Sequence, residues 1–418
     1  MKEREPHQTL LPHLFRQEYA RMTTVLCRHF GLKHIEIAED IASETFLKAS
    51  ESWAIHGMPE NPVAWLYTVA NNKTRDYFRR IALFETEIRD VLKPETAAED
   101  DFDYSDRRIA DSQLAMIFAV CSPDYSIESQ ICLALQILCG FSIEEIASAF
   151  LSKPETVKKR LHRARTRLRN DNFQVRELSE PEIRSRLPTV LKTLYLLFNE
   201  GYFSKTNNLQ IRKDLCSEAV RLALLLTENP LTSTPQANAL LALMCYQSSR
   251  LDARIDPQGR VILFDEQDKT LWDHSLIAKG HYYLVNACTG DEVSRYHLEA
   301  GIAYWHTAPA GENKWQHILQ LYDQLMLVEY APVTVLSRVF AFSRVYGPEE
   351  GIREAGKLDL ADNADYHALL GFLYAGTDAC KAIAHYRQAI ERSKSKAEKE
   401  TLRREMERLR ENNEPDHS

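Results

Sequence analysis

The chain has 418 residues, of which 44% are hydrophobic and 27% are charged, and its formal net charge at pH 7 is −8. These values are typical of a soluble globular protein with about two to four domains. The N-terminal residues MKEREPHQTL lack the apolar core of a signal peptide, and no apolar run approaches the roughly 18 residues of a membrane span. We therefore expect a cytoplasmic protein without a membrane partner.

The composition favours helices. Only 14 residues are glycine, whereas Leu, Ala, Glu, Lys and Arg are abundant. No sustained alternation of apolar and polar residues indicates strands. The expected fold class is therefore all-α.

The eight cysteines form no CxxC pair, and their spacing suits neither a zinc site nor a disulfide framework. We expect them to be buried thiols in a reducing compartment. They are Cys27, Cys121, Cys132, Cys139, Cys216, Cys245, Cys288 and Cys380.

The first helical segment is expected from Pro12 to about Leu83. Its residues 36–53 read EIAEDIASETFLKASESW, with apolar residues on one helical face and acidic residues elsewhere. The apolar face carries Ile37, Ile41, Thr45, Phe46 and Ala49.

A second helix in this segment, residues 63–80, reads VAWLYTVANNKTRDYFRR. Its apolar residues can face a core, which leaves aromatic, amide and basic side chains on another surface. Such a surface suits unpaired bases, because bases stack on aromatic rings while Lys and Arg hold the backbone. The alternative is an aromatic core with an ordinary polar face.

An acidic connector follows. Residues 84–111 carry ten acidic and four basic residues, and the stretch KPETAAEDDFDYSD, Lys93 to Asp106, is expected to be flexible. A compact helical unit from Ile109 to about Arg169 comes next.

The end of this unit, residues 141–169, reads FSIEEIASAFLSKPETVKKRLHRARTRLR. Ser142 stands three residues before Glu145, and Ser152 stands three residues before Glu155, so each pair predicts a capping box at the start of a helix. The second helix is expected to begin at about Lys153, with proline in its first turn. Its apolar stripe is Val157, Leu161, Ala164 and Leu168.

This second helix is strongly basic, because residues 153–169 hold eight Lys or Arg and one acidic residue. Two short helices with a tight turn are typical of a helix-turn-helix, whose second helix enters the major groove of DNA. The residues predicted to face the bases are Thr156, Lys158, Lys159, His162 and Arg163. The residues predicted to contact phosphate or solvent are Arg165, Arg167 and Arg169. The alternative is a solvated basic helix of a bundle.

Three stretches together resemble the extracytoplasmic-function (ECF) group of the sigma-70 family of bacterial transcription initiation factors. AEDIASETFLKASESW resembles region 2.2, NPVAWLYTVANNKTRDYFRR resembles regions 2.3 to 2.4, and residues 141–169 resemble region 4.2. The resemblance implies sigma domain 2 at 8–84, an acidic linker at 85–110 and sigma domain 4 at 111–172.

The resemblance also implies partners. Core RNA polymerase would bind through its β′ clamp and β flap, and promoter DNA would bind at its −10 and −35 elements, the latter through the helix-turn-helix residues named above. The implied polymerase-binding residues are Asp40, Glu44, Phe46, Leu47 and Trp53. The implied −10 residues are Asn61, Trp65, Asn72, Lys73, Arg79 and Arg80.

The remaining segment, 185–418, resembles the long C-terminal extension of one subgroup of these factors, which is helical and tetratricopeptide-like (TPR-like). Stretches such as LYLLFNEGYFS and HLEAGIAYWHT carry this resemblance. From Ala364 the chain also fits a tetratricopeptide pattern by itself. Gly371 and Tyr374 would lie on the first helix, and Ala382, Tyr386 and Ala389 on the second. A final charged helix is expected to cap the array.

The expected function is promoter-specific transcription initiation, regulated by the extension. A partner protein of the extension would contact Trp272 with Asp273 and Asn199 with Glu200, unless these residues only cap and pack helices. The main alternative is a stand-alone helix-turn-helix regulator with a helical sensor domain, but it leaves residues 36–80 unexplained.

No enzyme, cofactor or metal is expected. The sequence has no HExxH, GxSxG, P-loop or Rossmann motif. The scattered histidines of the extension are expected to be structural, with satisfied hydrogen bonds: His281, His297, His306 and His317.

Overall fold

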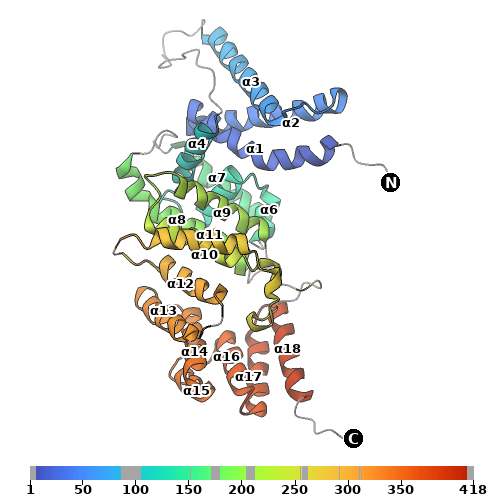
Figure 1. Ribbon diagram of the computed structural model, residues 1–418. Helices are drawn as coiled ribbons and strands as arrows, with labels where there is room; N and C mark the ends of the chain where they lie inside the picture. Colours follow the sequence, from blue (N-terminus) through green and yellow to red (C-terminus); the bar gives the residue numbers. More distant parts are fainter. Residues whose placement is uncertain are drawn as a thin grey trace. The chain divides into compact units, whose positions relative to one another are not determined.

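A computed structural model describes residues 6–85, 105–150, 152–170, 179–203, 212–254, 256, 262–290, 292–309, 311 and 313–411 (Figure 1). Every regular element in these ranges is a helix, which confirms the all-α fold. The chain forms two compact units, Met1–Leu194 and Tyr195–Ser418. Their boundary falls inside helix α8 (Glu180–Phe203), later than the expected start of the extension.

The first unit begins with three long helices. They are α1 (Pro6–Phe30), α2 (Ile35–His56) and α3 (Pro62–Glu85), with the short 3-10 turn η1 (Leu32–His34) after α1. Gly31 and Gly57 end α1 and α2 with φ angles of 79° and 81°, a left-handed conformation that glycine adopts without strain.

Five elements form the half of the first unit that contains the helix-turn-helix. They are α4 (Asp106–Val120), α5 (Ile127–Leu133), the π-helical turn η2 (Ala134–Leu138), α6 (Ile143–Ala149) and α7 (Pro154–Asn170). Helix α4 begins inside the segment predicted as linker, because the Ser105 side chain accepts a hydrogen bond from the Arg108 backbone N–H and caps the helix. The remaining linker, residues 86–104, lies outside the described residues.

Helix α1 joins the two halves of the first unit. It contacts α2 and α3, and it also contacts α4 and η2. As a result, all six consecutive residues from Met22 to Cys27 are buried. A helix that is buried all round lies inside a core rather than at its edge.

The second unit is a series of helices in which each packs on its neighbours in the sequence. They are α9 (Lys213–Glu228), α10 (Pro235–Ser248), α11 (His274–Ala287), α12 (Arg295–Thr307), α13 (Lys314–Val328), α14 (Pro332–Tyr346), α15 (Pro348–Ala355), α16 (Ala364–Tyr374), α17 (Ala379–Arg392) and α18 (Lys396–Glu411). Three 3-10 turns lie between α10 and α11: η3 (Leu251–Ala253), η4 (Phe264–Glu266) and η5 (Lys269–Leu271).

The predicted helix pair is present as α16 and α17. A side-chain carbon added at Gly371 would lie 2.4 Å from the ring of Tyr386, so glycine allows the two helices to approach closely. Ala382, Tyr386 and Ala389 are buried on α17, as the pattern predicted.

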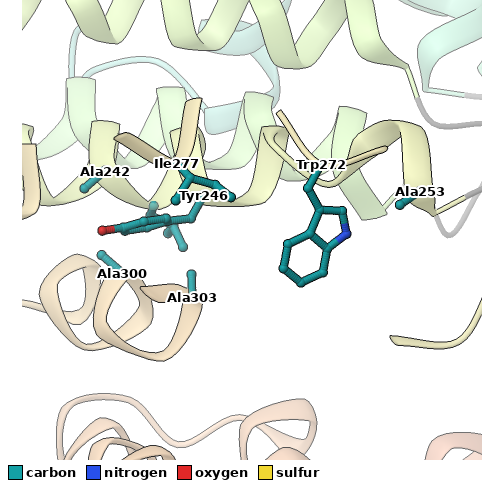
Figure 2. Packing of buried hydrophobic residues seen from close by; sticks show 8 residues of the cluster. Ala242, Tyr246, Ala253, Trp272, Ile277, Ala300 and Ala303 are labelled. Carbon is teal, nitrogen blue, oxygen red and sulfur yellow. The ribbon is translucent and has the colours of Figure 1, made fainter. Parts of the chain in front are cut away.

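The central core of this unit lies among α10, α11 and α12. Tyr246 places its ring between α10 and the alanines of α12, and Trp272 belongs to the same buried cluster (Figure 2). Asp273 caps α11 by accepting hydrogen bonds from the backbone N–H groups of Ser275 and Leu276, at 2.9 and 3.0 Å. Trp272 and Asp273 therefore pack and cap, which was the alternative to a role in binding a partner.

Six of the eight cysteines are buried, whereas Cys288 and Cys380 are exposed, contrary to the expectation of buried thiols throughout. Within the described ranges, no helix combines the length and the apolar character that crossing a membrane requires.

Candidate nucleic-acid interface

The turn that begins α6 has the predicted capping box. The Ser142 hydroxyl accepts a hydrogen bond from the Glu145 backbone N–H at 3.1 Å, and the Glu145 carboxylate accepts one from the Ser142 backbone N–H at 2.8 Å. Arg16 of α1 donates a hydrogen bond to the same carboxylate at 2.8 Å. The cap therefore fixes α6 and also ties it to α1.

The second predicted capping box is wrong. The hydroxyl of Ser152 is buried and has no hydrogen-bond partner, and α7 begins one residue later than expected, at Pro154. The carbonyl of Lys153 instead accepts hydrogen bonds from the backbone N–H groups of Thr156 and Val157, at 2.9 and 3.3 Å. Proline suits the first helical position because it needs no N–H partner there.

Helix α7 presents the predicted basic face. Its apolar stripe, Val157, Leu161, Ala164 and Leu168, is buried as expected. The five residues predicted to contact −35 bases are all exposed. They are Thr156, Lys158, Lys159, His162 and Arg163, and their contact with DNA stays a prediction.

A cationic hollow of about 390 Å³ lies between α7 and the start of α5. Lys159, Arg160, Arg163 and Arg167 line it from α7, and hydroxyl groups line it from α5. Such a set of cations and donors suits the phosphates of a nucleic-acid backbone.

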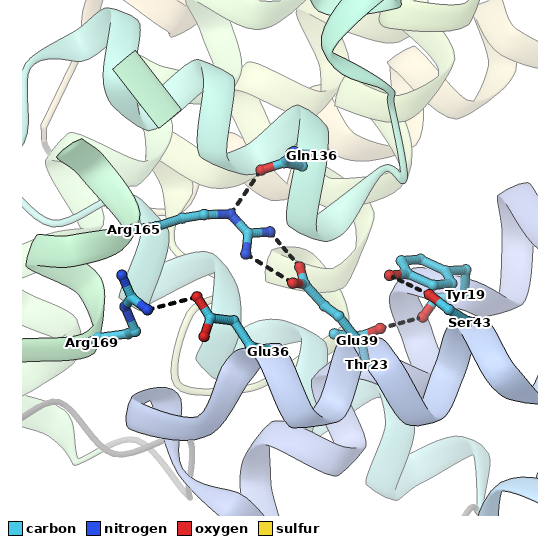
Figure 3. A network of polar contacts seen from close by, with 8 residues as sticks. All are labelled: Tyr19, Thr23, Glu36, Glu39, Ser43, Gln136, Arg165 and Arg169. Carbon is cyan, nitrogen blue, oxygen red and sulfur yellow. Dashed lines mark hydrogen bonds and ion pairs between the residues drawn. The ribbon is translucent and has the colours of Figure 1, made fainter. Parts of the chain in front are cut away.

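Two arginines of α7 point away from this face and toward α2 (Figure 3). Arg165 binds both carboxylate oxygens of Glu39, with Nη1 at 2.8 Å from Oε2, and its Nε donates to Gln136 at 2.9 Å. Arg169 forms an ion pair with Glu36 at 2.6 Å. Both arginines were predicted to contact phosphate or solvent, and the structure instead engages them within the protein.

The Arg165–Glu39 pair is largely buried, with 18% and 19% of the two side chains exposed. Burial alone would lower the pKa of Arg165, but the hydrogen bonds and charge of Glu39 more than offset it, so this pKa is raised. The Arg165 guanidinium is therefore charged, and its contact with Glu39 holds α7 against α2.

Helix α3 carries the residues predicted for the −10 element on a largely exposed face. Asn61 caps the helix by accepting a hydrogen bond from the Ala64 backbone N–H at 3.0 Å. Asn72, Arg79 and Arg80 are exposed, with Arg79 at 3.6 Å from Asp76.

The other two predicted −10 residues have partners within the protein. Trp65 is half-buried and packs edge-on against Trp53, with ring centroids 5.5 Å apart. Lys73 donates a hydrogen bond to Glu44 of α2 at 2.6 Å.

The predicted polymerase-binding residues divide into two groups. Asp40, Glu44 and Leu47 are exposed on α2. Phe46 and Trp53 are buried and present no exposed surface to a partner in this structure, so their contact with polymerase stays a prediction. Phe46 packs edge-on against Phe15 of α1, because it lies on the same helical face as the other core residues of α2.

Two apolar side chains near the end of α2 are exposed, although no motif in the sequence singled them out. Ile55 is 76% exposed and Met58 is 42% exposed. Their signal in the sequence is an apolar residue on each side of the turn at Gly57, where solvent-facing residues are usually polar. With Leu47 they give this part of the unit apolar contact area for a partner protein.

No group of His, Cys, Asp or Glu among the described residues has the geometry of a metal site. His297 is structural as expected, since its Nδ1 lies 3.1 Å from the Ser294 backbone N and its Nε2 lies 3.0 Å from the Ala287 carbonyl. In contrast, Nε2 of His281 and Nδ1 of His306 are buried without hydrogen-bond partners, so the expectation of satisfied histidines fails for these two.

Three segments of the chain match known families. Residues 14–83 match sigma-70 region 2, residues 126–168 match sigma-70, region 4, and residues 186–288 match DUF6596, a family of unknown function. The first two matches cover α1–α3 and α5–α7, the helices that carry the two surfaces described above.

Two curated proteins are similar to the chain. An uncharacterized protein of Rhizobium meliloti (strain 1021) is 29% identical over 398 residues, which cover 92% of each chain. The RNA polymerase sigma factor YlaC of Bacillus subtilis (strain 168) is 26% identical over 171 residues, which cover 41% of this chain and 96% of that protein. No solved structure matches the chain.

Proposed function

Because the chain carries sigma-70 regions 2 and 4 followed by a helical C-terminal extension, we propose that it is a sigma factor that binds core RNA polymerase and directs it to promoters. The observation that carries this proposal is the presence of two basic surfaces, on α3 and α7, within one unit. A stand-alone helix-turn-helix regulator would need only the second surface.

In this proposal each surface binds one promoter element. On α7, Lys159 and Arg163 reach the −35 element, where bidentate contacts of basic residues with guanine discriminate by about 1–3 kcal/mol each. On α3, Asn72 and Arg80 hold the melted −10 strand, and Trp65 offers a ring for an unpaired base.

The polymerase contacts follow from the exposed side chains of α2. Asp40, Glu44 and Leu47 bind the β′ clamp, and Ile55 adds apolar area next to them. The helix-turn-helix half contacts the β flap. Two domains in this order, joined by a connector, are the arrangement expected of the ECF group.

The extension regulates this activity in our proposal. The Rhizobium relative supports a combined role, because its similarity spans 92% of both chains and so includes the extension as well as the sigma regions. Successive packing of its helices, the arrangement of a TPR-like array, also suits a domain that binds a partner protein.

The test is runoff transcription with purified core polymerase on the DNA upstream of the gene. The full chain should start transcription at one site, and core polymerase alone should not. Lys159→Ala and Arg163→Ala should weaken −35 binding and lower the dependence of log Kd on log salt by about one unit for each phosphate that is no longer bound. The matched control is Lys192→Ala, which removes an exposed lysine of α8.

Two outcomes would reject the proposal. One is failure of the full chain to copurify with core polymerase while it still binds duplex DNA, which would favour the stand-alone regulator. The other is unchanged transcription by the α7 variants. For the extension, a chain that ends after Phe203 is compared with the full chain, once circular dichroism shows that both are folded. Equal transcription from the two would reject regulation by the extension.

A further inference from the structure

Three polar atoms are buried without partners around the ring of Phe264 in the extension. They are Nε of Arg250, Nε1 of Trp272 and Nδ1 of His306. The Arg250 guanidinium carbon lies 5.0 Å from the Phe264 ring centroid, and the ring centroids of His306 and Trp272 lie at 4.8 and 6.3 Å from it. Folded proteins leave few buried polar groups unsatisfied, so three around one ring require an explanation.

All three atoms can donate a hydrogen bond, so the group that would satisfy them is a hydrogen-bond acceptor. The arginine Nε and the indole Nε1 can only donate hydrogen bonds, and the imidazole can present its N–H at Nδ1. The guanidinium of Arg250 does have one partner, since Nη2 donates to the Tyr202 hydroxyl at 3.1 Å. That bond anchors Arg250 without neutralising it.

Positive charge collects at the same place. Nζ of Lys314 lies 3.4 Å from the carbonyl oxygen of His306, and Nζ of Lys269 lies 5.9 Å from the ring centroid of Trp272. In the part of the chain that the structure describes, neither Arg250 nor Lys314 forms an ion pair with a carboxylate. The nearby carboxylate of Asp265 is 3.6 Å from Arg344 instead.

The pKa shifts agree with this excess of positive charge. Burial lowers the pKa of Lys314, and the charges of Lys269 and Arg250 lower it further, while Asp265 opposes them weakly. Burial and the charges of Arg250 and Lys314 lower the pKa of His306 to about 3, so its imidazole is neutral near pH 7. A negative charge placed here would be stabilised.

An apolar cavity of about 380 Å³ adjoins the cluster through His306, which lines it together with Trp315. Tyr322, Leu336 and Phe340 form much of its remaining wall, and Asp365 contributes one carboxylate. Its size is at the lower end of the range for small-molecule sites.

We propose that the extension binds a small organic anion at this cluster. The carboxylate or phosphate group of the ligand accepts hydrogen bonds from Arg250, Trp272, His306 and Lys314, and its apolar body occupies the adjoining cavity. The donors without partners fix the charge of the headgroup, and the aromatic wall fixes the apolar character of the body. This site does not depend on promoter recognition, so it is tested without polymerase or DNA.

The test is isothermal titration calorimetry of the full chain with three matched probes: naphthoate, naphthyl phosphate and the neutral naphthamide. We expect one site per chain, and at least one anion should bind about tenfold or more tightly than the amide, because hydrogen bonds to a charged group are the stronger ones. The anion that binds better identifies the headgroup as carboxylate or phosphate. Absence of binding by both anions, or equal binding of the amide, would overturn the proposal.

Two substitutions locate the site. Lys314→Met should weaken anion binding about tenfold or more, whereas Lys279→Met, at an exposed position of α11, should leave it unchanged. Arg250→Lys keeps the charge but removes the Nε donor, and it should also weaken binding. Each variant is first shown to melt cooperatively. Wild-type affinity in both folded variants of the cluster would place the site elsewhere and overturn the proposal.

Discussion

Arg165 of α7 and Glu39 of α2 bind each other through a two-point contact, although 126 residues separate them in the sequence. One belongs to the helix that carries the predicted −35 residues, and the other to the helix that carries the predicted polymerase contacts. The pair therefore joins the helix predicted to bind the −35 element to the helix predicted to bind polymerase, within the first unit.

Removing the charge of Glu39 should destabilise the first unit. Glu39→Gln leaves the largely buried Arg165 without its charged partner, and we expect a loss of about 1–3 kcal/mol in the free energy of unfolding. Urea denaturation followed by circular dichroism measures it. Glu51→Gln, at an exposed position of the same helix, is the control, and an equal loss in both variants would contradict the specific role of the pair.

The same substitution should strengthen DNA binding by the protein without polymerase. Without Glu39 no carboxylate neutralises the charge of Arg165 behind the basic face of α7, so Glu39→Gln should bind duplex promoter DNA severalfold more tightly, with a steeper salt slope. Fluorescence anisotropy at several salt concentrations measures both. The double variant Glu39→Gln with Arg165→Gln should lose this gain, and a gain that persists would show that Arg165 is not its cause.

Ser142 and Ser152 precede α6 and α7 in similar sequence contexts, but only Ser142 has a hydrogen-bonded hydroxyl. Ser142→Ala should therefore cost about 1 kcal/mol of stability, the usual value for losing an N-cap. Ser152→Ala should be neutral or slightly stabilising, because it removes a buried hydroxyl without a partner. Thermal melts of the two variants test this, and an equal loss would restore the second capping box.

Gly371 and Gly376 provide a matched pair in the extension. Gly371→Ala would place a carbon 2.4 Å from Tyr386, and we expect a loss of about 1–3 kcal/mol from overpacking. Gly376→Ala meets no atom within 4 Å, so it should be close to neutral. Melting temperatures of the two variants distinguish them. Full stability of Gly371→Ala would show that α16 and α17 approach less closely than described.

The extension should lose stability in weak acid. Burial lowers the pKa of His306 to about 3 and also lowers that of His297 and His385, below the ordinary value of 6.5. Below about pH 6.5 the unfolded chain therefore binds protons that the folded chain does not bind. The contribution of these neutral histidines to the free energy of unfolding is present above that pH and is lost as the pH falls.

The slope of the unfolding free energy against pH measures this effect, with at most about 1.4 kcal/mol per pH unit from each histidine. His306→Phe should reduce the slope between about pH 6 and pH 4. His274→Phe, which removes an exposed histidine at the start of α11, should not. A slope that is the same in all three proteins would show that His306 does not titrate as described.

Local patterns predicted the helices α2 and α3, the helix-turn-helix, the α16–α17 pair and the final helix α18, but not the individual helices between α8 and α15. The buried stripe of α7 and the Gly371–Tyr386 contact follow from residue spacing, which depends only on helix geometry. The errors concern tertiary contacts. Nothing near Arg165 in the sequence indicates that a carboxylate of α2 lies beside it. Phe46 and Trp53 were assigned by resemblance to a surface, whereas the helical face they occupy buries them.

Because Met22–Cys27 are buried on all sides, α1 contributes side chains both to the core with α2 and α3 and to the core with α4 and η2. Such a helix cannot leave one core and keep the other intact. The half with α3 and the half with α7 should therefore melt together, in one cooperative transition, although family matches divide them into two domains. A substitution such as Leu26→Ala, which leaves a cavity at a fully buried position, should then destabilise the half with α3 and the half with α7 equally.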